Sequence, residues 1–189
     1  EDEKIPPGSL FNKKPTEDEL ADIVLKALGK QNLITNYSGT MHWNGQRWNR
    51  LGDELLRELV RPTLRTLGIP IRRALIVNVS NLIEDRTFDL NRRFNISKNH
   101  IVSVLNGDLL YLDGKWKLTP PERDRMRTTV LPHMYDPNAT APTFMQFLDD
   151  IFYGDADAHE KSSLVLQHMG YALQTHTDLE RFAIYFGTG

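Results

Sequence analysis

The sequence contains no cysteine among its 189 residues. This absence excludes disulfide bonds, cysteine-ligated zinc sites and thiol nucleophiles, and it favours a reducing compartment over secretion. No apolar run approaches the roughly 18 residues that are needed to span a bilayer, and no segment has the pattern of a signal peptide. The sequence therefore predicts a cytoplasmic protein with no membrane partner.

Motifs for catalysis by the chain itself are also missing. The six histidines show no H-E-x-x-H spacing, so no metal site is expected. The G-x-S-x-G motif that is typical of α/β-hydrolases does not occur either. The composition, with 40% hydrophobic and 25% charged residues, excludes a collagen-like or wholly disordered chain. Because the sequence begins without methionine and stops directly after an apolar run, we expect a fragment of a longer protein.

The charged residues are distributed unevenly along the chain. Residues 1–30 carry 5 basic and 7 acidic side chains, residues 31–127 carry 16 and 10, and residues 128–189 carry 2 and 8. Arginine, which binds phosphate through two parallel hydrogen bonds, dominates the basic stretch. The candidates for a nucleic-acid-binding face are Arg47, Arg50, Arg61, Arg65, Arg72, Arg73, Arg92, Arg93 and Lys98. The alternative is that opposite charges merely solvate two domains or attract each other.

The first third of the chain combines a linker pattern with a helix and a hairpin. Residues 1–15 lack periodicity and contain several prolines, which is typical of a flexible arm. The capping-box spacing of Thr16 and Glu19 begins a predicted helix, and Gly29 ends it. The pair Asn44-Gly45 predicts a two-residue hairpin turn. This turn places Met41 opposite Trp48, with Trp43 on the same face.

Two helices are expected after this hairpin. Apolar side chains at helical spacing predict a helix over residues 53–67, which Pro62 kinks or splits. A second helix is predicted over about residues 70–83, with Arg72 and Arg73 in its first turn. Cations at that position oppose the helix macrodipole, and a bound phosphate would offset the cost.

Residues 101–118 predict a three-stranded antiparallel meander, because Asn106-Gly107 and Asp113-Gly114 are both favoured hairpin turns. Two-residue loops predict the pairs Val104–Leu109, Val102–Tyr111, Tyr111–Trp116 and Leu109–Leu118, with these six side chains on one face. We expect Trp116 to be structural, so that its loss costs about 3 kcal/mol or more. Lys115 and Lys117 lie on the opposite face. After two helices, such a meander is similar to the wing of a winged-helix domain, which can lie along a phosphate backbone.

The last third is predicted to be helical. An amphipathic helix is expected behind Pro142, and a longer one over about residues 157–175. Gly170 inside the longer helix indicates close approach by another helix. Residues 182–186 are typical of a buried parallel strand and run into Gly187, Thr188 and Gly189. A strand that opens into glycines is how a phosphate-binding loop begins, but the G-x-x-x-x-G-K-[ST] motif is incomplete here.

Five segments together resemble the phage and plasmid primase-helicase family, which includes poxvirus relatives. They are VLNGDLLYL at 104–112, YDPNA at 135–139, PTFMQFLDDIF at 142–152, MGYAL at 169–173 and FAIYFGTG at 182–189. In that family the first four precede the Walker A strand of a superfamily 3 helicase, to which the fifth corresponds, and the resemblance covers residues 16–189. Tyr111 departs from the Asp that the family often has, so no role beyond the sheet is expected for it.

The resemblance implies the accessory region of a hexameric, ATP-driven replicative DNA helicase of a mobile element, contributing DNA contacts and ring geometry. ATP and Mg²⁺ are expected cofactors of the parent protein, with Gly187, Thr188 and Gly189 contacting the nucleotide. The present chain is expected to be inactive and to bind neither. Expected partners are DNA, further copies of the chain and a primase domain or protein.

The predicted fold is α+β and mostly helical, with small antiparallel hairpins, a winged-helix-like arrangement and the first strand of a truncated P-loop ATPase core. Four regions are expected: an arm over 1–15, a basic α+β domain over 16–127, a helical segment over 128–181 and the start of the core over 182–189. The residues expected to contact DNA are Arg47, Arg72, Arg73, Arg92, Arg93, Lys98, Lys115 and Lys117.

Two other functions are compatible with the same sequence. A stand-alone winged-helix-like replication initiator would bind DNA without a motor, and its terminal Gly-Thr-Gly would be only a turn. A docking module for a primase or a loader would use the acidic last third of the chain to bind a basic partner.

Overall fold

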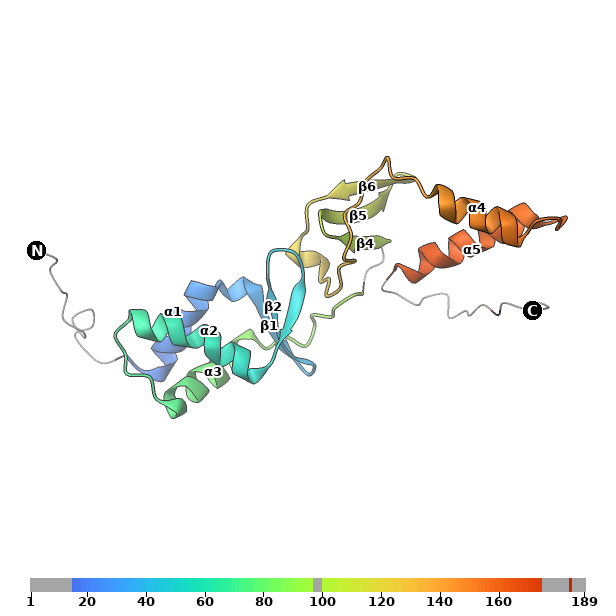
Figure 1. Ribbon diagram of the computed structural model, residues 1–189. Helices are drawn as coiled ribbons and strands as arrows, with labels where there is room; N and C mark the ends of the chain where they lie inside the picture. Colours follow the sequence, from blue (N-terminus) through green and yellow to red (C-terminus); the bar gives the residue numbers. More distant parts are fainter. Residues whose placement is uncertain (1–14, 97–99, 175–183, 185–189) are drawn as a thin grey trace, which may run out of the picture. The chain divides into compact units, whose positions relative to one another are not determined.

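The computed structural model describes residues 15–96, 100–174 and 184, and it divides the chain into two compact units (Figure 1). The first unit is Glu1–Phe94 and the second is Asn95–Gly189. Each contains helices and one three-stranded antiparallel sheet, so the predicted α+β class is confirmed. Except for Pro15 and Ile184, the predicted arm and the predicted start of an ATPase core lie outside the described residues.

The first unit begins with the capped helix that the sequence predicts. The backbone N–H of Glu19 donates to the Thr16 hydroxyl over 3.2 Å, and the Thr16 N–H donates to the Glu19 carboxylate over 2.7 Å. Gly29 ends the helix at a φ of 75°, which favours glycine. The elements of this unit are α1 (Glu17–Leu28), β1 (Leu33–Asn36), β2 (Gly39–Trp43), β3 (Trp48–Leu51), α2 (Asp53–Thr66) and α3 (Arg73–Thr87).

Helices α2 and α3 differ from the predicted pair in their details. Pro62 does not split α2, which runs unbroken to Thr66. Helix α3 begins at Arg73 rather than near residue 70, because Arg72 has extended backbone angles and serves as the N-cap. The connection between the helices is instead organised by backbone hydrogen bonds that close the end of α2, from the N–H groups of residues 67–69.

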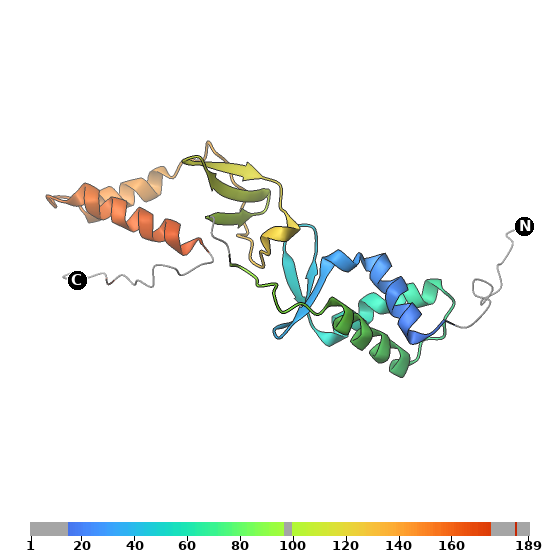
Figure 2. The same cartoon turned by 180° about the vertical axis from the view of Figure 1, so that it is seen from behind.

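The core of the first unit lies between its three helices, which Figures 1 and 2 show packed together beside the sheet. Its buried members include Leu20, Val24, Leu56, Val60, Leu64, Ile76, Val79 and Ile83. A chain of hydroxyl hydrogen bonds ties the sheet to α3, since Thr35 contacts Thr87 at 2.8 Å and Thr40 at 3.1 Å. The sheet is therefore anchored to the helices on which the candidate site is built.

The β2–β3 hairpin has a longer turn than the sequence predicts. Trp43 lies opposite Trp48, whereas the prediction placed Met41 there. Asn44 explains the difference, because its side-chain oxygen accepts hydrogen bonds from the N–H groups of Gln46 and Arg47, stabilising a four-residue loop. Trp48 is buried and is 1% exposed.

The second unit contains the predicted meander, made of β4 (Ile101–Val104), β5 (Gly107–Leu112) and β6 (Lys115–Thr119). The predicted β5–β6 register is confirmed, with Tyr111 opposite Trp116. The β4–β5 register is different, because Val104 pairs with Gly107 rather than with Leu109. The turn moves by one residue since Asn106 forms two hydrogen bonds with the backbone of Tyr135, a residue far away in sequence.

Two helices follow the meander, α4 (Pro142–Ile151) and α5 (Ala158–Ala172). Helix α4 begins at Pro142 as predicted, and Leu148 is its one buried residue. The predicted reason for Gly170 is wrong for the described residues, because a Cβ atom there would have no neighbour within 4 Å. Within the described part of the chain, no helix combines the length and the apolarity that crossing a membrane requires.

Candidate nucleic-acid interface

Three arginines of the first unit surround one cavity. Arg57 and Arg61 are four residues apart on α2 and therefore lie on the same side of the helix. Arg73 is the first residue of α3. The cavity has a volume of about 280 Å³, and its lining consists of Arg57, Arg61, Ile71, Arg73, Ile76 and Val77. We call Arg57, Arg61 and Arg73 the arginine cluster.

The ion pairs between the arginine cluster and its acidic neighbours are weak. The Arg57 guanidinium is 4.0 Å from the Asp53 carboxylate, and the Arg61 Nε atom is 3.1 Å from that of Glu58. Both acidic side chains are well exposed, and exposed ion pairs of this kind contribute little to stability. Arg73 is exposed and forms no ion pair with any residue that the structure describes. A phosphate can therefore compete for these guanidinium groups.

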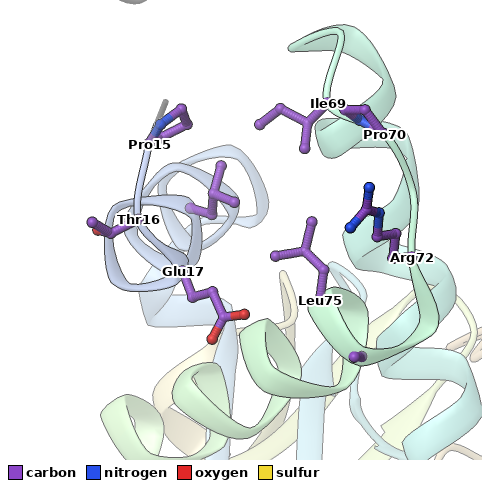
Figure 3. A pocket seen from close by; sticks show the side chains of 9 residues that line it. Pro15, Thr16, Glu17, Ile69, Pro70, Arg72 and Leu75 are labelled. Atoms are coloured by element: carbon purple, nitrogen blue, oxygen red, sulfur yellow. The ribbon is translucent and has the colours of Figure 1, made fainter. Parts of the chain in front are cut away.

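Arg72 and Arg73 are adjacent in the sequence, but they line different cavities. Arg72 faces a cavity of about 380 Å³ between the start of α1 and the α2–α3 connection (Figure 3). The side chains of Ile69 and Leu75 point into this space, and the Glu17 carboxylate lies on its α1 side. An apolar lining with a carboxylate does not favour an anion, so the cavity of the arginine cluster is the better candidate for a phosphate.

The other predicted DNA-binding residues of the first unit do not line the cavity of the arginine cluster. Arg47 lies in the β2–β3 loop, where its Nε donates to Asn49 over 2.9 Å. Arg92 is paired with Asp89 at 3.6 Å, and its neighbour Arg93 is exposed. Lys98 lies outside the described residues.

Lys115 and Lys117 are exposed on β6 of the second unit, whereas α2 and α3 belong to the first. Both lysines alternate along the strand with Trp116, so they lie on the face opposite its ring, as predicted. Lys117 is 3.4 Å from the exposed Asp113 carboxylate. These lysines are separate from the arginine cluster and form a second basic candidate.

Part of the positive charge in the basic stretch is used inside the protein. Arg86 of α3 pairs with Asp18 and Asp22 of α1. Arg127 is only 2% exposed, and one of its Nη atoms donates to the Ile101 carbonyl over 3.2 Å. Burial lowers the pKa of the Arg127 guanidinium, and the negative charge of Asp108 partly opposes that shift. Arg127 is therefore not available to a nucleic acid, and Arg86 links α3 to α1.

Arg57 was missed among the sequence candidates for the arginine cluster. The signal was present, since Arg57, Arg61 and Arg65 recur every four residues along the predicted helix. The spacing of residues along the sequence does not reveal that the start of α3 packs beside this side of α2. The start of α3 adds Arg73 to the α2 arginines.

The described residues place no group of three or more potential metal ligands together. Gly187, Thr188 and Gly189, the expected nucleotide-contacting positions, lie outside the described residues.

Comparison with known protein families gives one match that extends over both units. A family model described as D5 N terminal like matches residues 21–153. A search of the curated proteins finds no match. The matched residues include the whole arginine cluster, the complete meander and helix α4.

Proposed function

The chain belongs to the D5 N-terminal-like family, which forms the N-terminal domain of phage and plasmid primase-helicase proteins, and we propose that it is the accessory region of a superfamily 3 replicative DNA helicase. It contributes DNA contacts and ring geometry to ATP-driven unwinding in the parent protein. The observation that carries the DNA contact is the convergence of Arg57, Arg61 and Arg73 on one cavity. DNA, neighbouring copies of the chain and a primase domain are its proposed partners.

The arginine cluster suits a DNA phosphate for three reasons. Guanidinium groups present several N–H donors to one anion and keep their charge at any physiological pH. Arg73 begins α3, so the cluster adjoins backbone N–H groups that no preceding helical turn satisfies. The remaining lining is aliphatic, which weakens competition from water. Such contacts position a DNA backbone and do not select a base sequence.

The parent protein is proposed to bind ATP and Mg²⁺ through a phosphate-binding loop that begins at Gly187–Gly189. ATP hydrolysis would supply the free energy of unwinding, while the residues described above hold DNA near the ring. Measuring ring formation and unwinding by a longer chain that carries the complete loop, with and without the arginine cluster, tests this division of roles.

The DNA contact is tested with the 189-residue chain by measuring affinity for duplex DNA over a series of salt concentrations. Replacing the arginine cluster, as Arg57→Gln, Arg61→Gln and Arg73→Gln together, removes up to three cations that bind phosphate. The slope of log affinity against log salt should fall by about 1 for each phosphate that is no longer neutralised. Lys26→Gln, which removes an exposed cation of α1 outside the cavity, is the matched control and should change little. An unchanged slope in the triple variant would contradict the proposal.

A protein-docking role has its own supporting observation in the α4–α5 hairpin. Several large apolar side chains of these helices are exposed, including Met145, Phe147, Ile151, Leu164, Leu166 and Met169. The same segment is rich in acidic residues, which favours a partner with basic and apolar groups, such as a primase or a loader. Binding of such a partner together with failure to bind DNA would favour this function over the first.

A further inference from the structure

One half of an apolar sheet face in the second unit is covered by protein and the other half is open. Val102, Val104 and Leu109 are buried against the segment that contains Leu131 and Tyr135. On the same face, farther along β5 and β6, three side chains remain exposed: Tyr111 by 45%, Trp116 by 43% and Leu118 by 40%. The open half is therefore mainly aromatic.

The two aromatic rings are held in a defined arrangement. Tyr111 and Trp116 are direct cross-strand neighbours, with ring centroids 5.3 Å apart and planes inclined at 58°. The His100 ring contacts the Tyr111 ring edge-on, with centroids 6.4 Å apart. Because the backbone register and these contacts restrict both rings, the exposed part of Trp116 is ordered before any ligand binds.

Positive charge lies on the same edge strand as Trp116, on the opposite face of the sheet. Lys115 and Lys117 precede and follow Trp116 on β6, which is the edge strand of the described sheet. Their stems start on the opposite face, but β6 has no described strand on its outer side, so both ammonium groups can reach around that edge. Lys115 forms no ion pair with a described residue, and Lys117 has only the exposed partner Asp113.

We propose that Tyr111 and Trp116 form a stacking platform for an unpaired base of single-stranded DNA, while Lys115 and Lys117 bind the adjoining phosphates. An aromatic ring stacks on any base, and flanking cations neutralise the backbone. A purely apolar protein partner would not require the two lysines at this position. This inference rests on the proposed function, because both take DNA as the ligand. The arginine cluster of the first unit is proposed to bind phosphates, whereas the platform of the second unit is proposed to bind a base.

The test compares two oligonucleotides of equal length, oligo-dT and a chain with the same sugar-phosphate backbone but no bases. The 189-residue protein should bind oligo-dT about fivefold or more tightly, because only oligo-dT can stack. Trp116→Leu should abolish this preference, and Trp116→Phe should retain most of it. Tyr153→Leu, at an exposed aromatic residue of the same unit, is the matched control and should leave it unchanged.

The main comparison of a second readout uses the unaltered chain alone. Oligo-dT should quench tryptophan fluorescence of the unaltered chain more strongly than the base-free oligonucleotide does, and Trp116→Phe should remove the difference. Oligo-rU as a third ligand distinguishes DNA from RNA, and clear preference for oligo-rU would overturn the assignment to DNA.

The possible failures are distinguishable. If neither oligonucleotide binds but duplex DNA does, the platform alone is wrong, and if duplex DNA does not bind either, the proposed DNA contact is wrong as well. If both bind equally and with a salt slope that depends on the arginine cluster, DNA binding stands but base stacking is refuted.

Discussion

One Nη atom of Arg125 lies 2.7 Å from a carboxylate oxygen of Asp108, and both side chains are almost buried, at 12% and 3% exposed. The same guanidinium donates to the Pro120 carbonyl over 2.8 Å and pairs with Glu122 at 2.8 Å. Arg125 thereby ties the segment after β6 to the start of β5. Arg125, which belongs to the basic stretch of residues 31–127, is therefore a structural bridge.

Breaking this bridge should destabilise the second unit strongly. Arg125→Met leaves the Asp108 carboxylate buried without its partner, which typically costs about 3–5 kcal/mol. The free energy of unfolding in urea measures the effect. Lys117→Met, which removes an ion pair exposed on the same sheet, should change stability by less than about 1 kcal/mol. Equal effects of the two substitutions would refute the structural role of Arg125.

Trp48 and Trp116 should differ in their contribution to the stability of the protein. Trp48 is 1% exposed and packs edge-on against Phe94, so Trp48→Ala should cost about 3–5 kcal/mol. Trp116 is 43% exposed, which lowers the expected cost of Trp116→Ala to about 1–2 kcal/mol. Urea midpoints of the two variants provide the comparison, and the reverse order would contradict the described burial.

Among the glycines of the described residues, Gly107 is expected to tolerate a side chain poorly. Its φ is 154°, and a Cβ atom there would lie 2.5 Å from the Thr119 carbonyl oxygen of the neighbouring strand. Gly107→Ala should therefore separate β5 from β6 and cost more than about 2 kcal/mol. Gly114→Ala is the control, because Gly114 also has a positive φ but open space around it, and about 1 kcal/mol is expected. Thermal unfolding of both variants tests the difference.

The stability of the first unit should fall in mild acid through His42. Partial burial lowers the pKa of His42 below its ordinary value of 6.5. As the pH falls below 6.5, the unfolded chain takes up a proton that the folded state still excludes, so stability decreases until the folded pKa is reached. Urea midpoints at pH 7.5 and pH 5.5 should differ less in His42→Asn than in the unaltered chain. An identical pH dependence in both proteins would exclude this role of His42.

The 189-residue chain is expected to lack ATPase activity, because it contains no complete G-x-x-x-x-G-K-[ST] motif. A longer chain with that motif should hydrolyse ATP and assemble into rings. Phosphate release and particle mass, measured for both chains side by side, test the prediction. An inactive and monomeric longer chain with an intact motif would argue against the motor.

The sequence alone predicted the conformation wherever interactions between neighbouring residues determine it. The capping box of Thr16 and Glu19, the turn at Asp113-Gly114 and the resulting pair of Tyr111 and Trp116 all follow from interactions within a few residues. Helix periodicity likewise predicted α2, because its apolar side chains recur on the face that becomes buried.

The tertiary structure determined the features that depend on contacts between residues far apart in the chain. Asn106 moves the β4–β5 turn because it binds the backbone of Tyr135, 29 positions away. Arg73 lies near Arg57 only because α3 begins beside α2. The ion pair with Asp108 keeps the Arg125 side chain largely buried. Charge composition identified a basic region, but the free energies of burial and packing determined which arginines stabilise the fold and which remain open to phosphate.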